Sequence, residues 1–295
     1  MRSRAVPIVA VLLGAIACAD PTPTPTPFAG PTPNPTAAAT PTPIAPTPIA
    51  PTLEPNAPVL RLTVYEFPTA VTIKETPEFT LYADGRVIYA VKFRPPNAAW
   101  STFELHSAQL NADQATALMS VALDEGGLRD ARGEYNIPNA VDREWNYFEV
   151  HVDGVDKEVR VYGLSDESAP DAAERVRFAT LRDRLLNFPA VIQAGQAANL
   201  GIFEPTAYDA FLHSGVVTEE LPVNADWPWP ELDVSDFGSV NGTVWRRLTQ
   251  AQGEAVSELG INEYLIAEAP DDEKYLIRIR PLLPDEASEP GPVFE

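Results

Sequence analysis

The sequence predicts an α+β fold in which antiparallel hairpins pack with a few helices. Two Asp-Gly pairs, Asp84-Gly85 and Asp153-Gly154, each separate two runs of strand-like residues, which is the pattern of a β-hairpin with a tight turn. Two other segments have apolar residues at helical spacing. Hairpins accompanied by separate helices, instead of a regular alternation of strand and helix, are typical of α+β proteins.

The first predicted hairpin joins residues 79–83 to residues 86–91 through Asp84-Gly85. A type I′ turn needs positive φ at both central positions, which Asp and Gly tolerate. A two-residue loop there would place Leu81 opposite Ile88. The strands predicted outside this hairpin in the same part of the chain are residues 59–65 and 102–106.

A helix is predicted to begin after Asn111. Asn111 is a preferred N-cap residue, and Gln114 three positions later completes the pattern of a capping box. The pair Gly126-Gly127 ends the helix. The apolar face of this helix is predicted to consist of Ala115, Leu118, Met119, Ala122 and Leu123.

The second predicted hairpin turns at Asp153-Gly154, between residues 145–152 and 158–162. Its register stays open, because residues 155–157 could belong to a longer loop. A charged helix follows at about residues 170–186. Its apolar positions are Phe178, Leu181 and Leu185.

The remaining residues are less regular and predict a second, smaller α+β lobe. The predicted strands are residues 208–212, 244–248, 264–267 and 275–279, and the predicted helix is residues 250–259. We therefore expect one α+β domain at residues 59–189 and a second lobe at residues 190–295.

The composition argues against nucleic-acid binding. The chain has 42 acidic residues against 21 Lys and Arg, so its formal net charge is −21. A polyanion would be repelled unless the protein had a concentrated basic patch, and the sequence contains no Lys/Arg-rich run. We expect no nucleic-acid partner.

The first residues have the pattern of a secretory signal peptide. Arg2 and Arg4 precede a short apolar core that is too short for a membrane span, and small residues follow it. The stretch Ala15-Ile16-Ala17-Cys18 resembles the lipobox of bacterial lipoproteins. This resemblance implies a signal peptide at residues 1–17 and a diacylglycerol group on the sulfur of Cys18, the only cysteine. The alternative is an ordinary secreted protein with a cysteine there by chance.

Residues 18–58 are nearly all Pro, Thr and Ala, a composition that cannot build a core. Each proline favours extended polyproline II geometry, so the segment is predicted to be a semi-rigid, disordered stalk with a reach on the order of 100 Å. The alternative is a plain disordered linker. At the other end, the stretch 280–286, together with the two Asp-Gly hairpins and the helix after Asn111, is similar to uncharacterised secreted lipoproteins of bacteria. That similarity implies a compartment and a fold but no activity.

No residue pattern indicates catalysis. His106 and His213 each precede a serine, but neighbours in a strand point to opposite faces, so the hydroxyl and the imidazole would not meet. His151 lies on a predicted hairpin. Acidic residues in turns could offer oxygen ligands to a hard cation, or could simply keep the surface hydrated. We predict no catalytic residue, no metal site and no cofactor. The acidic residues considered are Asp130, Glu134, Asp142, Glu144, Asp271, Asp272 and Glu273.

Four residues are candidates for ligand binding. Trp227 and Trp229 alternate with prolines, so they form either an exposed aromatic platform or a lid over the core. Arg278 and Arg280 share the outward face of the last predicted strand and either pair with acids or contact an anionic ligand.

These observations predict a lipoprotein on the extracytoplasmic face of the cell membrane. The lipid anchor is expected to contact the membrane, and the anionic α+β region is expected to bind an envelope protein or a glycan. Two alternatives stay open. One is an extracytoplasmic hydrolase or glycan-active enzyme that uses paired carboxylates, and the other is a structural component of the envelope.

Overall fold

The structure is a computed structural model that describes residues 54–65, 75–93, 102–138, 140, 143–152, 154–166, 169, 171–214, 223, 225–240, 243–259 and 265–288. All of them belong to one compact unit, Pro51–Glu295. The predicted signal peptide, Cys18 and the predicted stalk up to residue 53 lie outside the described residues.

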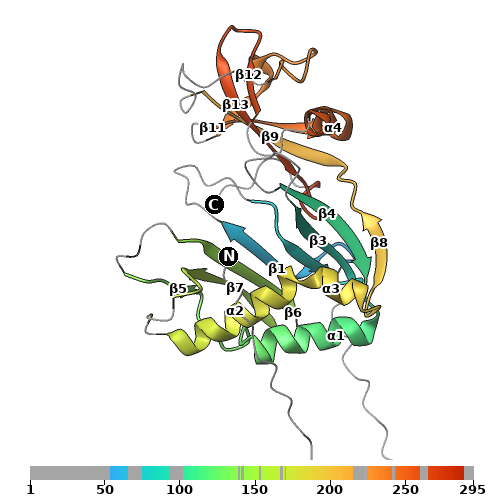
Figure 1. The fold of residues 1–295 in the computed structure, drawn as a ribbon, viewed down its shortest axis with the longest axis vertical. Coiled ribbons are helices and arrows are strands. Elements are labelled where there is room, and N and C mark those ends of the chain that lie inside the picture. The colour runs from blue at the N-terminus through green and yellow to red at the C-terminus, as the bar shows by residue number, and fades with distance from the viewer. Residues whose placement is uncertain are drawn as a thin grey trace, which may run out of the picture. The chain divides into compact units, whose positions relative to one another are not determined.

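The predicted α+β class is confirmed, because the described residues form two β-sheets with helices beside them (Figure 1). The larger sheet has eight strands in the order β5-β7-β6-β1-β2-β3-β4-β8, and all neighbouring pairs except β5–β7 are antiparallel. Its strands are β1 (Pro58–Tyr65), β2 (Phe79–Tyr82), β3 (Arg86–Phe93), β4 (Thr102–Gln109), β5 (Glu134–Tyr135), β6 (Trp145–Val152), β7 (Val155–Tyr162) and β8 (Ala198–Ile202).

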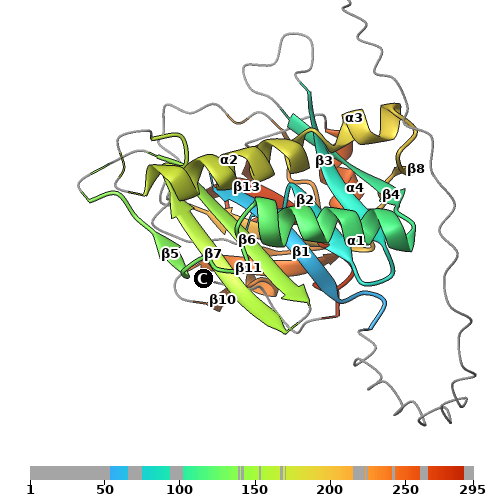
Figure 2. The same cartoon turned by 90° about the horizontal axis from the view of Figure 1, so that it is seen from below.

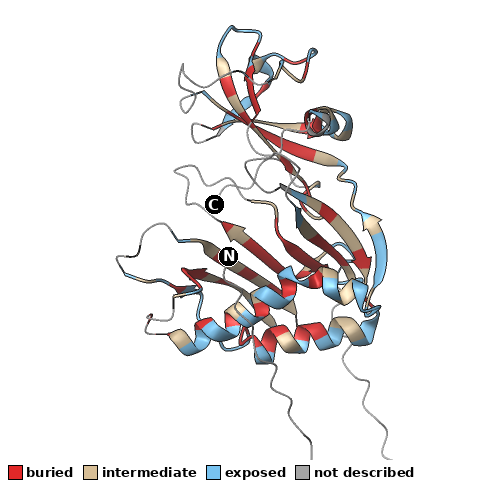
Figure 3. Ribbon diagram, viewed as in Figure 1, coloured by how far each residue is buried: buried red, intermediate tan, exposed pale blue. Residues whose placement is uncertain are grey.

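Three α-helices cover one face of the eight-stranded sheet (Figures 1 and 2). Leucine, valine and phenylalanine side chains of the strands pack there against the apolar sides of the helices and form the largest core cluster. Buried residues are concentrated in the strands and in stripes along the helices (Figure 3). The helices are α1 (Ala112–Ser120), which continues as a π-helical turn (Val121–Glu125), α2 (Ala172–Leu186) and α3 (Phe188–Gln193).

The helix start at Asn111 forms as the sequence predicts. The Gln114 amide donates to the Asn111 side chain at 2.9 Å, and the Asn111 amide donates to Gln114 Oε1 at 2.8 Å. Both bonds satisfy amides that have no partner inside the helix. Leu118, Met119, Ala122 and Leu123 are buried in the core, and Ala115 is partly buried against it, so the predicted apolar face is confirmed.

The register predicted for the first hairpin is wrong by one residue. Leu81 pairs with Val87, not with Ile88. The amide of Gly85 donates to the carbonyl of Tyr82 at 3.0 Å, and Gly85 has a φ of 83°. A glycine in the left-handed region after a tight turn is typical of a three-residue hairpin loop, which shifts the pairing relative to the two-residue loop that we predicted.

The second hairpin has the shorter of the two loops considered. Val152 pairs with Val155, so β7 begins directly after the turn and includes the residues whose place was open. Gly154 has a φ of 73°, the left-handed conformation that such a turn requires. This register places Phe148 opposite Val159, and both are fully buried against the helices.

The second sheet has five strands in the order β10-β11-β9-β13-β12, and all its neighbouring pairs are antiparallel. Its elements are β9 (Ala207–His213), β10 (Gly238–Val240), β11 (Thr243–Thr249), β12 (Leu265–Glu268), β13 (Lys274–Pro281), the helix α4 (Gln250–Glu258) and a 3-10 turn (Val234–Asp236). The strands and the helix predicted for this part of the chain are thus present. Strand β8, which falls within the range expected for the second lobe, instead pairs with β4 in the first sheet.

Helix α4 approaches the second sheet through Gly253, and we expect Gly253→Ala to destabilise the protein. An added Cβ would lie 2.1 Å from Cδ2 of Tyr208, a residue that is only 7% exposed. The gain in helix propensity is about 1 kcal/mol, but overpacking costs about 1–3 kcal/mol. Urea unfolding should therefore show a net loss.

The matched control is Gly133→Ala, where the nearest atom to an added Cβ is the carbonyl oxygen of Glu158 at 3.8 Å. This variant should stay within about 0.5 kcal/mol of the parent. A Gly253→Ala variant as stable as the parent would show that α4 does not pack on Tyr208 as described.

Candidate functional site

The turn after β13 connects the two sheets. The amide of Leu282 donates to the carbonyl of Ala207 at 3.0 Å, which fixes the turn to the second sheet. The next side chain, Leu283, is fully buried in a cluster with Tyr82, Ile88 and Leu105 of the first sheet. We call residues 282–288 the C-terminal turn. Two consecutive residues of this turn, Leu282 and Leu283, therefore contact the second and the first sheet, respectively.

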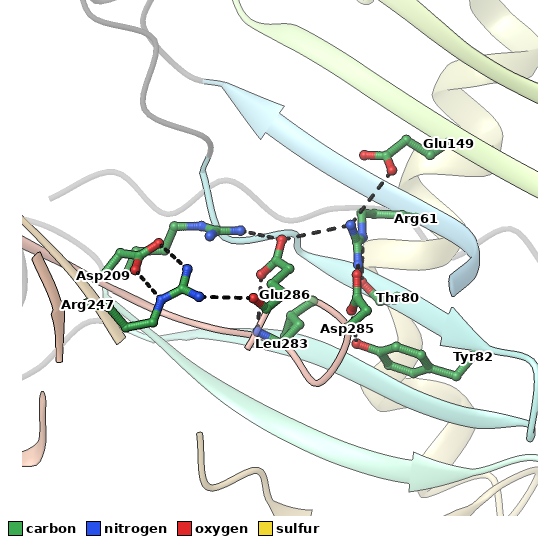
Figure 4. Close-up of polar contacts among 10 residues, drawn as sticks. Arg61, Thr80, Tyr82, Glu149, Asp209, Arg247, Leu283, Asp285 and Glu286 are labelled. Carbon is green, nitrogen blue, oxygen red and sulfur yellow. Dashed lines mark hydrogen bonds and ion pairs between the residues drawn. The ribbon is translucent and has the colours of Figure 1, made fainter. Parts of the chain in front are cut away.

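Arg61 lies at the centre of a polar cluster next to this turn (Figure 4). It comes from β1, whose neighbouring residues Leu60 and Leu62 face the helix-covered core, so its side chain points to the opposite face. Its Nη2 donates to Asp285 Oδ2 at 2.7 Å, and its Nε donates to the Thr80 hydroxyl at 3.3 Å.

Two further carboxylates and a phenol complete the first-sheet side of the cluster. Arg61 Nη1 lies 3.7 Å from Glu149 Oε2 and 3.8 Å from Glu286 Oε1. The hydroxyl of Tyr82 donates to Asp285 Oδ1 at 2.9 Å. Because Arg61 is only 2% exposed, its charge depends on these carboxylates for compensation.

Glu286 extends the cluster to the second sheet. Its Oε1 accepts a hydrogen bond from Arg280 Nη2 at 2.5 Å, and its Oε2 accepts one from the amide of Leu283 at 3.1 Å. Arg247 on β11 donates to the backbone carbonyl of Glu286 at 3.5 Å and to Asp209 Oδ1 at 2.9 Å. The two sheets therefore share one buried network of alternating charges (Figure 4).

The electrostatics of the network keep Arg61 charged and Tyr82 protonated. Burial alone would lower the pKa of the Arg61 guanidinium, but the charges of Asp285, Glu149 and Glu286 outweigh burial and raise that pKa above its ordinary value. Burial, and then the charge of Asp285, raise the pKa of the Tyr82 hydroxyl, which stays protonated and donates. This arrangement suits a fixed ionic joint, because a buried ion pair needs hydrogen bonds at both partners.

Both arginines that the sequence offered as ligand contacts are paired with carboxylates. Arg280 contacts Glu286 as described above. Arg278 Nη2 donates to both oxygens of Glu75, at 2.9 and 3.1 Å. Of the two uses considered for these arginines, the structure displays pairing with acids.

The two tryptophans have different surroundings. Trp229 is 1% exposed, and its indole N–H donates to the carbonyl of Gln252 at 2.9 Å, so it is a core residue. Trp227 is only partly buried, and its N–H donates to the carbonyl of Leu232 at 2.9 Å. Their ring centroids lie 5.3 Å apart in an edge-to-face arrangement, and Phe237 contacts both rings.

A pocket of about 400 Å³ lies beside Trp227. The pocket is also lined by the aliphatic residues Val223, Ala225 and Ala269 and by two acidic residues, Asp226 and Glu268. The main chain is held there by a parallel bridge between Ala225 and Ala267 at the end of β12. We call this concavity the Trp227 pocket.

The histidines are engaged in separate local contacts. His106 Nε2 lies 2.7 Å from Glu104 Oε2, whereas the hydroxyl of Ser107 donates to the carbonyl of Gly201 at 3.4 Å. His151 Nδ1 lies 2.6 Å from Asp156 Oδ1 across the second hairpin. Burial, and then the charge of Arg278, lower the pKa of His213. The neighbouring Ser107 and His106 thus use different partners, as their alternation in a strand requires.

Within the described ranges, no three His, Cys, Asp or Glu side chains come close enough together to hold a metal ion. Asp142, one of the acidic residues considered as oxygen ligands, lies outside these ranges. Asp271 accepts hydrogen bonds from the Tyr275 hydroxyl at 3.0 Å and from the Glu273 amide at 3.2 Å.

None of the helices in the described ranges has the length and apolar character needed to cross a bilayer.

The sequence did not single out Arg61, Asp285 or Glu286, although each is central to the polar cluster. The one local indication was that Arg61 falls at an outward position of a predicted strand. An arginine at such a position is usually just exposed to solvent, so the pattern did not point to a buried cluster. Asp226 and Glu268 were missed as well. They are 42 residues apart in the chain and meet only because of a backbone bridge.

Comparison of the chain with protein-family models, with curated protein sequences and with solved structures gave no match. The function therefore has to be inferred from the chain's own residues.

We expect Arg61→Met to reduce the free energy of unfolding by about 3–5 kcal/mol, because it removes the cation that pairs with Asp285 and leaves Glu286 with Arg280 alone. The control is Arg129→Met, which removes an exposed pair with Asp124 and should cost less than about 1 kcal/mol. Adding Asp285→Asn to Arg61→Met should restore part of the loss. Equal small effects for both arginines in urea unfolding would contradict the proposed role of Arg61.

Glu78 gives a pH-dependent prediction. Burial, opposed by the charge of Lys92 at 3.4 Å and by a hydrogen bond from the Val64 amide, raises its pKa from 4.5 to about 7. The folded state therefore binds more protons than the unfolded state between these values. This contribution, on the order of 3 kcal/mol, is complete below about pH 4.5 and is lost as the pH rises through about 7.

We expect the stability of the parent minus that of Glu78→Gln to fall as the pH is raised from about 4.5 to about 8 in urea unfolding. Glutamine keeps an acceptor for the Val64 amide but does not titrate in this range. A difference that is constant, or that rises with pH, would refute the altered pKa.

Proposed function

We propose that this chain is a bacterial lipoprotein that carries a lipid on Cys18 and displays a binding domain on the extracytoplasmic face of the cell membrane. The apolar leader, the residues before Cys18 and the Pro/Thr-rich segment after it support the anchor. A tethered binding module benefits from reach and from a high local concentration near its partner.

The Trp227 pocket is the observation that carries the binding part of the proposal. Binding sites are concave and combine apolar or aromatic walls with polar groups that orient the ligand. The pocket has an indole wall, aliphatic neighbours and two exposed carboxylates, and its volume of about 400 Å³ lies within the usual range. Tryptophan is also among the residues that most often dominate binding energy.

The pocket wall is held rigidly before any ligand binds. The N–H group of Trp227 is used by Leu232, and its ring packs edge to face on Trp229 and Phe237. The bridge between Ala225 and Ala267 joins the preceding residues to β12. A preformed wall lowers the entropy cost of binding.

The contacts of the buried carboxylates argue against hydrolysis at the polar cluster around Arg61 and at Glu78. Glycan cleavage by paired carboxylates requires two of them to face a common substrate, one carrying a proton. Asp285 and Glu286 instead point at arginines. Glu78, whose raised pKa of about 7 would suit a proton donor, contacts the Val64 amide and Lys92.

Photocrosslinking in intact bacteria tests the proposal with the full chain. A photoreactive residue replaces Val223, which lines the pocket and is 40% exposed, and in the control it replaces Val176 on α2, which is 62% exposed. We expect one discrete crosslinked product from position 223 that Glu268→Lys abolishes. Products that are the same from both positions, or that survive Glu268→Lys, would contradict binding at this pocket.

The same strains test the anchor. Mass spectrometry of the mature protein should find a lipid on Cys18, and Cys18→Ser should move the protein out of the membrane fraction. An unmodified thiol, or membrane retention of Cys18→Ser, would refute the lipoprotein assignment independently of the crosslinking result.

A further inference from the structure

We propose that the Trp227 pocket binds a positively charged group, an ammonium or a guanidinium such as the end of a lysine or arginine side chain. The proposal rests on the binding function above and names the chemical class of its ligand. Three features of the pocket support it: its two carboxylates, its aromatic wall and the charge of the whole chain.

The two carboxylates are close together because of the backbone. Ala225 and Ala267 are partners in a parallel bridge, and Asp226 and Glu268 are the next residues along the two chains. Paired backbone segments lie about 4.8 Å apart, so this arrangement places the two acidic residues next to each other on neighbouring segments. Like charges directly next to each other are destabilising unless a cation lies between or beside them.

Neither carboxylate makes a hydrogen bond or an ion pair with another described residue, although both side chains are exposed. Asp209, Glu75 and Glu286, in contrast, each pair with an arginine. Lys274 is the cross-strand partner of Glu268 on β13, but its ammonium group is not within 4.0 Å of that carboxylate. Two negative charges against one lysine leave the site anionic.

The aromatic wall adds a second attraction for a cation. The face of an indole carries negative electrostatic potential, and tryptophan is the strongest aromatic partner for lysine and arginine. The N–H group of Trp227 is already bonded to Leu232, which fixes the orientation of the ring. A pocket of about 400 Å³ has room for an alkylammonium or guanidinium group.

The charge of the whole chain acts in the same direction. With a formal net charge of −21, the protein attracts cationic groups over distances of about a Debye length and repels anionic ones. An anionic ligand would be repelled by the two carboxylates, and a neutral ligand could hydrogen-bond to them but would gain no charge attraction.

The test compares two peptides that differ in one charge. Acetyl-Gly-Lys-Gly-amide is titrated into the 15N-labelled full chain, and the indole N–H resonance of Trp227 is followed. The comparison peptide carries an acetylated lysine, which keeps the stem and removes the charge. We expect saturable binding of the lysine peptide with a dissociation constant on the order of millimolar, and at least about tenfold weaker binding of the acetylated peptide.

The variants locate the binding energy. Asp226→Asn with Glu268→Gln should weaken binding of the lysine peptide at least about tenfold, whereas Lys274→Gln should strengthen it by removing a competing cation. The matched control, Asp113→Asn with Glu174→Gln, makes the same change of net charge at two exposed helix positions, α1 and α2, and should bind like the parent.

Equal affinity for the two peptides, or parental binding by the Asp226/Glu268 variant, would overturn the assignment of a cationic ligand. So would the lack of a saturable shift at about 50 mM peptide, a concentration well above the expected dissociation constant. If that result accompanied a specific crosslink from position 223, the binding function would stand and only its ligand class would fail.

Discussion

The charge of Arg61 is the constraint on which the arrangement of the two sheets depends. A guanidinium that is 2% exposed must be compensated, and the compensating carboxylates come mainly from the C-terminal turn, more than 200 residues away in the chain. The turn therefore has to reach the first sheet for either partner to be stable. Removing one partner of a buried ion pair is strongly destabilising, because the other charge stays buried without compensation.

The joint has consequences for the Trp227 pocket. Strand β13 leads directly into the C-terminal turn, and the same strand pairs with β12, whose last residue, Glu268, lines the pocket. The pocket thus lies on the second sheet, and Arg280 and Arg247 of that sheet hydrogen-bond to Glu286 of the C-terminal turn. A fixed support of this kind suits a site that works by electrostatic attraction and ring contact, because little entropy is lost on binding.

Local patterns in the sequence predicted most of the fold. The capping box at Asn111, the apolar spacing on α1 and α2, and both Asp-Gly turns are rules that act over a few residues, and each appears in the structure. The register of the first hairpin was missed because an Asp-Gly pair fits both loop lengths: the glycine is left-handed in the longer loop at Gly85 and in the shorter loop at Gly154. The polar cluster and the carboxylates of the Trp227 pocket could not be predicted, since Arg61 meets Asp285, and Asp226 meets Glu268, only through the packing of distant segments.

Native-state hydrogen exchange of the Asp285→Asn variant tests the joint most directly. In the parent, the account predicts that the central strands of both sheets, β1 and β9, exchange with one common free energy, because the buried network couples their opening. In the variant, amides of β9, β11 and β13 should exchange at a lower free energy than those of β1 and β6. Separate opening of the two sheets in the parent, or unchanged common opening in the variant, would contradict the central role of the Arg61 network.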